Sequence, residues 1–304
     1  MVPPCVPTTH KDQSNVKRQD FRFFHPLRVR WVEVDMQKIV FNAHYLMYFD
    51  TGMADYWRAL AVPYEEAMHM LGGDLYVKKA SMEYFDAARF DDTLHIALKC
   101  VRVGHSSIEF AGAVFRGEAL LVKSEMVYVF ANPATRKSQG VPDALRELLR
   151  VYEDGGVVHG LKTGTWAELG ADAAQLRMEV FVREQGVPIE LEWDEADSQA
   201  IHAVLYNRLG QVLATGRLLA NSLEAVGSGK VGRMAVKRVV RGSGMGRRIL
   251  DALTAEARRR GDSELVLHAQ LSAKGFYERA GFCSRGDVFD EVDIAHVEMF
   301  KTLI

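Results

Sequence analysis

Apolar residues in the first half of the chain recur at two spacings, one typical of strands and one typical of a helix. These spacings divide this half into elements. Apolar and polar residues alternate within residues 23–34, around Leu27, Val29 and Trp31, which predicts a half-buried strand. An unusually apolar helix follows and ends before Pro63. Alternation then resumes in segments that we expect to be antiparallel strands, over residues 76–85, 93–103, 106–116 and 119–131. Because a long apolar helix needs a surface to cover it, we predict an α+β domain in which the sheet wraps round the helix.

The second half alternates helical and strand patterns, as in a mixed α/β sheet. We predict helices over 166–184, 247–260 and 272–280, and strands over 201–205, 212–219, 231–236 and 264–270. Between the two halves, a short helix over Pro142–Leu149 is broken by Glu153–Gly156, so we place the boundary near Gly156. The predicted organisation is a disordered tail over 1–22 and two domains over 23–155 and 156–304.

Three alternate glycines, Gly242, Gly244 and Gly246, connect a strand to the helix that ends at Gly261. Without Cβ atoms the backbone can curl, so that N–H groups at the helix N-terminus point at one anionic group. The spacing fits neither G-x-G-x-x-G nor the Walker A loop. We therefore predict a seat for a pyrophosphate, and the loop alone leaves open a plain glycine-rich turn before a surface helix.

Three motifs in this half occur together. Arg241–Gly246 reads R-x-x-G-x-G, Val180–Pro188 reads V-F-x-x-E-Q-x-V-P, and Ala273–Phe282 reads A-x-x-F-Y-x-x-x-G-F. Over residues 161–304 the chain resembles the GNAT superfamily of acyl-CoA-dependent N-acyltransferases. The resemblance implies a mixed α/β fold, acetyl-CoA or CoA as co-substrate, a small-molecule amine as acceptor, and no metal.

The same resemblance implies roles for individual residues. Tyr277 matches the tyrosine that lies beside the CoA sulfur in relatives, so it is the candidate acid for the departing thiolate. Its alternative is a core tyrosine packed beside Phe276, and Glu184 is a candidate for binding the acceptor. The residues expected to bind CoA are Met234, Ala235, Val236, Arg241, Gly242, Ser243, Gly244, Met245, Gly246, Gln270 and Phe276.

The general base of this site stays open. Some acetyltransferases carry a glutamate on the strand before the loop, but Met234-Ala235-Val236 stand there in this chain. The remaining candidates, each also explicable as a structural residue, are Glu184, Asp194, Asp197, His202, His268 and His296.

The first half carries its own signature, Asp35 followed by Ile39–Tyr45. Over residues 24–149 it resembles the 4-hydroxybenzoyl-CoA thioesterase-like family of hotdog acyl-CoA hydrolases, which implies the hotdog fold and a homo-oligomer, at least a dimer. Asp35 matches the catalytic aspartate, as base or nucleophile, with a turn aspartate as the alternative. Lys38 stands where relatives often carry glycine.

The helix that follows this signature would supply the rest of the site. The N–H groups of Asn42 and Ala43 would polarise the thioester oxygen with the help of the helix dipole, and the Asn42 side chain is a further catalytic candidate. The expected substrate-binding residues are Ala43, His44 and Tyr45, of which His44 also fits a capping or surface role.

Composition narrows the function classes. The 304 residues are 48% apolar with a net charge of −2, which favours two globular domains and argues against nucleic-acid binding. No apolar run approaches the length of a membrane span. The three cysteines lack C-x-x-C spacing, so we expect no disulfide framework and a reducing, cytoplasmic setting.

We therefore predict a bifunctional CoA-thioester enzyme that hydrolyses acyl-CoA in its first domain and acylates an amine in its second. Two alternatives stay open. The second domain could only sense acyl-CoA beside an active thioesterase, or the first could be a dimerisation scaffold for an active transferase. Acyl chain length and the identity of the amine are outside what the sequence specifies.

Overall fold

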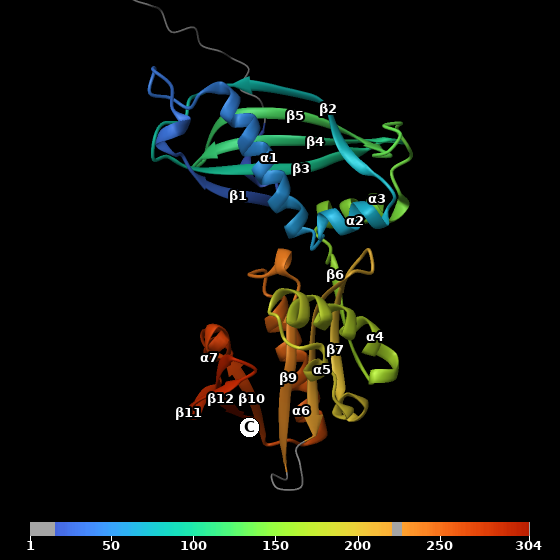
Figure 1. Ribbon diagram of the computed structural model, residues 1–304. Coiled ribbons are helices and arrows are strands. Elements are labelled where there is room, and N and C mark those ends of the chain that lie inside the picture. The colour runs from blue at the N-terminus through green and yellow to red at the C-terminus, as the bar shows by residue number, and fades with distance from the viewer. Residues whose placement is uncertain (1–15, 221–226, 304) are drawn as a thin grey trace, which may run out of the picture. The chain divides into compact units, whose positions relative to one another are not determined.

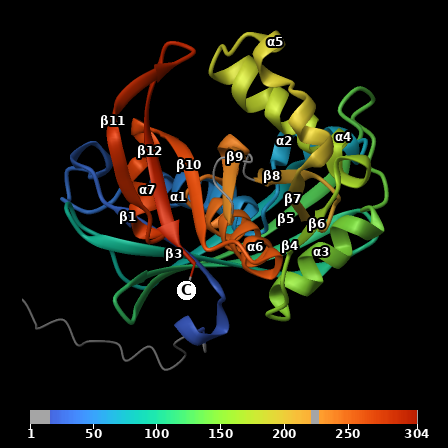
Figure 2. The same ribbon diagram turned by 90° about the horizontal axis from the view of Figure 1, so that it is seen from below.

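The computed structural model describes residues 16–220 and 227–303, and the chain divides into two compact units (Figures 1 and 2). One unit comprises the described residues up to Tyr56 together with Gly72–Pro142. The other comprises Trp57–Leu71 and the chain from Asp143 onward. The predicted domain limits stay predictions, and by packing α3 (Asp143–Glu153) groups with the second unit.

The first unit is a five-stranded antiparallel sheet with one long helix, α1 (Asn42–Ala59), against it. Its strands in the order β1-β3-β4-β5-β2 are β1 (Phe23–Arg28), β3 (Thr93–Val103), β4 (Ser107–Arg116), β5 (Ala119–Ala131) and β2 (Asp74–Tyr84). The predicted hotdog fold is confirmed.

Aromatic side chains fasten α1 to the sheet. Phe49 is fully buried, and a Cβ atom on Gly112 of β4 would lie 2.6 Å from its ring, so a glycine is needed for the helix to come this close. Tyr56 meets Phe23 and Phe110 edge to face, each with ring centroids 5.5 Å apart. The apolar helix pattern of the sequence thus becomes the core of this unit.

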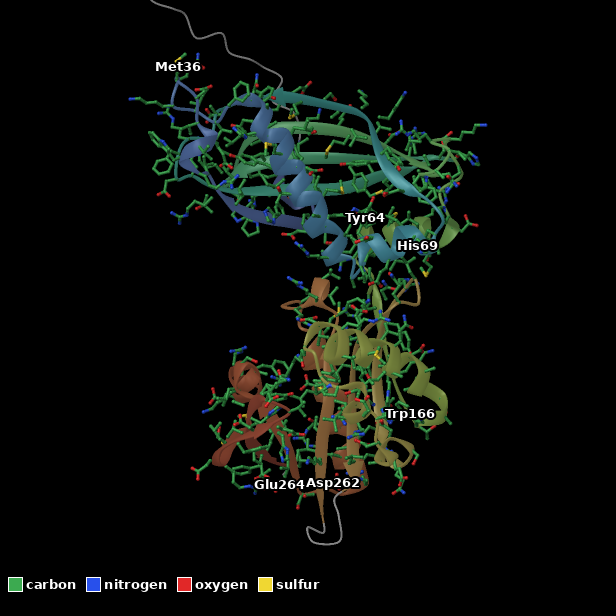
Figure 3. The ribbon with its side chains drawn as sticks, viewed as in Figure 1. Met36, Tyr64, His69, Trp166, Asp262 and Glu264 are labelled. Carbon is green, nitrogen blue, oxygen red and sulfur yellow. The ribbon has the colours of Figure 1, made fainter. Side chains whose placement is uncertain are left out.

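The first strand is shorter than its alternation predicts. β1 ends at Arg28, and Trp31–Glu33 forms a 3-10 helix in which Trp31 is 74% exposed. The reason is Glu33, which is buried and accepts hydrogen bonds from the backbone N–H of Arg30 and the hydroxyl of Tyr48. A strand would turn this carboxylate away from both donors. Met36, just beyond, is exposed at the far end of the turn (Figure 3).

The predicted tail falls partly outside the described residues, since 1–15 are not among them. Residues 16–22 belong to the fold, contrary to that prediction. Arg18–Asp20 forms a 3-10 helix, and Phe21 is 8% exposed, with its ring 6.1 Å from that of Phe115.

The second unit is a seven-stranded mixed sheet. Its order is β11-β12-β10-β9-β8-β7-β6, in which only β9 and β10 pair in parallel. The strands are β6 (His159–Gly164), β7 (Ile201–Asn207), β8 (Val212–Ala220), β9 (Ser228–Val236), β10 (Glu264–Gln270), β11 (Cys283–Glu291) and β12 (Ile294–Thr302). The helices are α2 (Tyr64–Met70), α3, α4 (Trp166–Arg177), α5 (Ile189–Glu192), α6 (Met245–Arg260) and α7 (Lys274–Arg279). The predicted mixed α/β fold is confirmed.

Helices α4 and α6 cover opposite faces of this sheet (Figure 2). Ala235 of β9 packs in a core cluster with Leu169 and Leu176 of α4. On the other face, a Cβ atom on Gly216 would lie 2.7 Å from Ile249 of α6, so the glycine admits that helix. The predicted helix over 166–184 is α4 continued by a π-helix over Met178–Glu184.

The segment Trp57–Leu71 is attached to this unit by polar contacts. The Asn207 side chain donates to the carbonyl of Ala61 at 2.9 Å. Lys237, buried just after β9, donates to carboxylate oxygens of Glu66 and Glu179, each at 2.7 Å. These contacts explain why α2 groups with the second unit although its neighbours in sequence lie in the first.

Within residues 16–220 and 227–303, no helix combines the length and the hydropathy that crossing a bilayer requires. The same residues contain no group of three or more His, Cys, Asp or Glu side chains placed to hold a metal ion.

Candidate active sites

Strands β9 and β10 separate after a short paired segment. Their parallel register joins Ser228–Lys230 to Glu264–Val266 and goes no further. On its other edge β9 carries a bulge, since Arg233 and Met234 stand where β8 has only Gly216, and Arg233 has a φ of 50°. A bulge increases strand twist. Past Lys230, the backbone groups of β9 on the side of β10 therefore have no partner on that strand.

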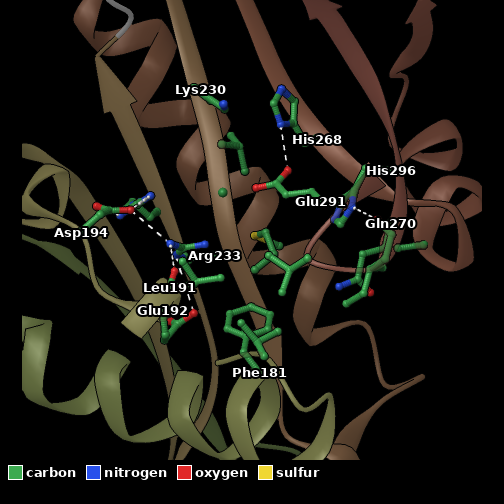
Figure 4. Close-up of a pocket in the computed structure, with 18 of the residues that line it drawn as sticks. Phe181, Leu191, Glu192, Asp194, Lys230, Arg233, His268, Gln270, Glu291 and His296 are labelled. Atoms are coloured by element: carbon green, nitrogen blue, oxygen red, sulfur yellow. Dashed lines mark hydrogen bonds and ion pairs between the residues drawn. The ribbon is translucent and has the colours of Figure 1, made fainter. Parts of the chain in front are cut away.

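A cavity of about 560 Å³ is lined by the separated parts of these strands (Figure 4). Six residues singled out in the sequence line it: Met234 of β9, Gln270 of β10, Tyr277 of α7, and the candidate bases Asp194, His268 and His296. The tip of the β11–β12 hairpin contributes Glu291. Ala235 lies instead in the core beneath α4.

Tyr277 is held among aromatic rings and is 8% exposed. The ring of Phe276 lies 4.9 Å away and that of Phe282 lies 6.0 Å away, centroid to centroid. Burial raises the pKa of Tyr277 to about 12. Its hydroxyl therefore stays protonated at neutral pH and remains a proton donor. Phe276 is outside the cavity lining and serves as packing for Tyr277 and for Gly246.

The glycine loop has the backbone that was predicted for it. Gly242 and Gly244 have φ values of 85° and 83°, and α6 begins directly after them at Met245. The first N–H groups of a helix have no acceptor within it, so those of Met245 and Gly246 are available to an anion. Ser243 does not add its hydroxyl, which donates to the carbonyl of Val240 at 2.5 Å.

Arg241 fixes this loop from the side. Its guanidinium donates to both carboxylate oxygens of Glu184, at 2.5 and 2.8 Å, and to the carbonyl of Val236 at 3.0 Å. The hydrogen bond from Arg241 lowers the pKa of Glu184. Glu184 is not among the residues that line the cavity, so its predicted contact with the acceptor is replaced by a contact with the loop.

A buried ionic network accounts for three of the candidate bases. Arg177 donates to Asp197 at 2.9 Å, and Arg217 donates to Asp197 at 2.8 Å and to Asp194 at 2.6 Å. Burial would raise the pKa of Asp197, but the hydrogen bonds from the two arginines outweigh it and lower the pKa. The ring of His202 is fixed by a 2.9 Å contact between Nε2 and the Asp197 carbonyl.

The network includes residues that sequence reasoning did not single out. Arg177 also bonds Glu192, which is fully buried, and Arg233 donates to Asp194 at 3.2 Å. Figure 4 shows Arg233 between Asp194 and Glu192 on one side of the cavity. No sequence motif marks these partners, because buried arginine pairs are recognised only once their burial is known.

The first unit has a cavity of about 520 Å³ at the predicted thioesterase signature. Asp35, Asn42 and Tyr45 line it, whereas Ala43 and His44 do not. Asp35 accepts a hydrogen bond from the backbone N–H of Gln37 at 2.8 Å, which is the bonding of a turn aspartate, yet Asp35 also lines the cavity.

Local geometry explains the other signature residues. Lys38 has a φ of 61°, the left-handed conformation that glycine adopts without strain, which is the conformation in which a glycine would be expected at this position. Asn42 begins α1, and its carbonyl accepts the Tyr84 hydroxyl at 3.2 Å. Tyr45 is buried and its hydroxyl accepts the N–H of Ala88 at 2.9 Å, so it supports the wall. His44 instead packs against the ring of Phe41, with centroids 6.0 Å apart.

Comparison with known proteins assigns both halves. Residues 169–303 match the family model described as Acetyltransferase (GNAT) domain. A Bacillus subtilis protein named as an acetyltransferase is 36% identical over 133 residues, which cover 42% of this chain and 86% of that protein. The chain belongs to the GNAT acetyltransferase family. The uncharacterized N-acetyltransferase YjcF of Bacillus subtilis is 37% identical over 131 residues, 43% of this chain and 90% of that protein.

The GNAT domain is fused to a second one. Residues 37–123 match the family model described as Thioesterase superfamily. A Bartonella henselae protein described as a thioesterase has a solved structure with 19% identity and a TM-score of 0.37, covering 40% of this chain and 98% of that chain. The predicted fusion of a thioesterase domain with a GNAT domain is confirmed.

Proposed function

We propose that the GNAT unit transfers an acyl group, by preference acetyl, from CoA to a small-molecule amine. The observation that carries this proposal is the separation of β9 and β10 around a cavity lined by Tyr277. The backbone of β9 near Met234, past the end of its pairing with β10, is suited to the amides of a pantetheine arm, and the loop at Gly242–Gly246 to the pyrophosphate.

In this reaction the amine nitrogen attacks the thioester carbonyl, and the C–S bond then breaks. The departing thiolate needs a proton, and Tyr277 is the donor we assign. Its pKa of about 12 keeps the hydroxyl protonated until the thiolate forms. Packing against Phe276 and Phe282 holds the ring of Tyr277 in place, and Tyr277 lines the cavity.

The test is to incubate the wild-type chain with acetyl-CoA and a panel of primary amines, and to detect N-acetylated products by mass spectrometry. We expect at least one amine to be acetylated with equal release of free CoA. Binding of acetyl-CoA without any acetylated amine would overturn the transferase and favour the role of an acyl-CoA sensor.

We further propose that the thioesterase domain hydrolyses acyl-CoA. Asp35 lines the same cavity as Asn42, the first residue of α1, and this pairing of a carboxylate with a helix N-terminus supports the proposal. The carboxylate would activate water or attack the carbonyl itself, and the N–H groups at the start of α1 would stabilise the oxyanion. A scaffold without activity would need neither group.

Free-thiol release from a panel of acyl-CoAs, with no amine present, tests this activity. We expect Asp35→Asn to lower the rate by about 10²-fold or more. Asp91→Asn is the matched control, because Asp91 is an exposed turn aspartate of the same unit, paired with Arg28 and outside the cavity. No turnover in either protein would reduce the domain to a scaffold, and equal measurable rates in both would remove Asp35 as the catalytic group.

We propose that the chain assembles at least as a dimer in the cytoplasm. Strand β2 is an edge of the sheet and exposes Tyr76 and Val77, which supports pairing with a second copy. Cys283 is an exposed free thiol, in keeping with a reducing compartment. Sedimentation velocity measures the assembly, and a monomer at micromolar concentration would contradict it.

A further inference from the structure

Two side chains from different strands meet in the wall of the GNAT cavity. His268 of β10 and Glu291 at the end of β11 both line it, and His268 Nδ1 lies 3.3 Å from a carboxylate oxygen of Glu291 (Figure 4). Their side chains are 31% and 49% exposed, so both are accessible to a small molecule in the cavity. If Nδ1 carries the proton and donates it to the carboxylate, Nε2 has a free lone pair.

The ring of His268 is positioned by an aromatic stack as well as by Glu291. Phe289 of β11 meets it edge to face with centroids 5.0 Å apart, and the other side of Phe289 stacks on His296 of β12 at 6.1 Å. His296 is in turn fixed by a 2.7 Å contact of its Nδ1 with the carbonyl of Ile294. Three neighbouring strands therefore fix the orientation of one imidazole.

The other candidate bases are committed elsewhere. Asp194, Asp197 and His202 belong to the arginine network, and Glu184 is paired with Arg241. His296 also lines the cavity, but it is only 9% exposed and its Nδ1 is held by the Ile294 carbonyl. Among the described residues that line the cavity, His268 is the candidate that combines exposure with an orienting carboxylate.

We infer that His268, oriented by Glu291, is the general base that takes the proton of the acceptor amine. The inference rests on the proposed acyl transfer and names the residue that this transfer leaves unassigned. It also specifies the acceptor as an amine that arrives as a cation, because Glu291 places a carboxylate at the same wall.

The proton balance is complete with these groups. An ammonium substrate transfers one proton to Nε2 of His268, and the freed lone pair attacks the thioester carbonyl. The N–C bond forms, the C–S bond breaks, and the thiolate takes the proton of Tyr277. The second proton on nitrogen returns through solvent to the Tyr277 phenolate, and His268 releases its proton to water. The products are the amide, CoA thiol and one proton.

The experiment compares wild type, His268→Gln, His268→Ala and Glu291→Gln with acetyl-CoA and the amine panel. His69→Gln is the matched control, because His69 is an exposed histidine on α2 of the same unit (Figure 3).

For His268→Gln we expect kcat to fall by about 10²-fold or more while KM for acetyl-CoA changes by less than about threefold. Imidazole added to His268→Ala should restore part of kcat. Glu291→Gln should lower kcat by about tenfold, with KM values unchanged, because the base remains but loses its orientation.

Different failures are distinguishable. A His268→Gln variant as active as wild type overturns the inference and leaves the transferase standing. Parallel losses in kcat and in acetyl-CoA affinity, with no rescue by imidazole, assign His268 a structural role and also overturn it. If His268→Gln does not fold, the test is made on Glu291→Gln. An unchanged kcat in Glu291→Gln overturns the inference that Glu291 orients His268. A wild type that acetylates no amine refutes the proposed function itself, and the role of His268 with it.

Discussion

Tyr277 illustrates how a residue can be both a core side chain and a chemical group. The sequence leaves these two readings open, and the structure combines them, because the ring is packed between phenylalanines while the residue lines the cavity. The same packing raises its pKa to about 12. The burial that packs the ring thus also keeps the hydroxyl protonated, as the proposed role of Tyr277 as acid requires.

Replacing Tyr277 by Phe should separate proton donation by the hydroxyl from packing of the ring. We expect kcat for amine acetylation to fall by about 10²-fold, because the thiolate loses its proton donor. KM for acetyl-CoA and the thermal midpoint should change little, since the ring and its contacts remain. Tyr206→Phe serves as control: it removes a hydroxyl that donates to Asp172 at 2.6 Å, outside the cavity, and should leave kcat unchanged. Full activity in Tyr277→Phe would remove Tyr277 as the acid.

His202 provides a pH-dependent prediction. It is 1% exposed, and this burial lowers its pKa below the ordinary value of 6.5, although the contact with Asp197 opposes the shift. The unfolded chain therefore takes up a proton before the folded chain does. The contribution of the neutral, buried His202 to the stability of the folded chain is fully present above the pKa of His202 in the unfolded chain. It is lost as the pH falls through the pKa of His202 in the folded chain.

Urea unfolding of the wild type and His202→Gln at several pH values measures this effect. We expect the free energy of unfolding of the wild type to decrease from about pH 7.5 to about pH 5, and the variant to show a smaller decrease. That range stays above the acid region in which Asp194 and Asp197 begin to contribute, since Arg217 lowers the pKa of Asp194, and Arg177 and Arg217 lower the pKa of Asp197. Equal slopes for both proteins would show that His202 does not titrate on unfolding.

At the scale of elements, the glycine loop and α6 form one continuous structural unit. Gly244 is the N-cap of α6 with a φ of 83°, and a Cβ atom placed on it would meet nothing within 4 Å. Its glycine is therefore required by backbone conformation and not by lack of space. This requirement is visible in the sequence as a glycine motif, because the left-handed conformation of one residue at a helix start depends on the backbone of that residue alone.

Gly244→Ala should disturb CoA binding through this backbone. Gly210 in the β7–β8 turn is a matched control, with a φ of 82° and equally open surroundings. Both alanine variants should lose about 1–2 kcal/mol of stability. Only Gly244→Ala should also weaken acetyl-CoA binding, by about tenfold or more, because the altered backbone would change the direction of the N–H groups at the start of α6. Isothermal titration with acetyl-CoA checks this, and equal affinity in both variants would remove the loop from the CoA site.

At the scale of the whole molecule, two units carry two separate candidate sites. Asp35 lines a cavity of the first unit and Tyr277 lines a cavity of the second. Among the described residues, none lines both cavities. The two reactions should therefore be separable by mutation.

A crossed experiment tests this separation in the full chain. Asp35→Asn should lower acyl-CoA hydrolysis by about 10²-fold and leave amine acetylation within about twofold of wild type. Tyr277→Phe should do the reverse. If either variant lowered both activities to the same extent, the two sites would be coupled and the independence argued above would be wrong.

What the sequence by itself determined is local or periodic in character. The period of its apolar residues predicts α1, the strands of the first sheet, and β7, β8, β9 and β10 of the second, but not β6, β11 or β12. The glycines predict the loop before α6, and the motifs identify both domain families. These features depend on backbone sterics and on side chains a few positions apart, which a sequence displays directly. The early end of β1 escaped this reasoning, because it depends on the burial of Glu33 by Tyr48 of α1.

Only the tertiary structure decided which distant side chains meet. Glu184 was expected at the acceptor and is paired with Arg241, 57 positions away, and the meeting of His268 with Glu291, 23 positions apart, has no signature in the sequence. Such pairs form because the sheet brings strands together in an order unlike their order in the chain. The charge and orientation of a catalytic group depend on these neighbours, so the general base could be assigned only after the fold had placed them.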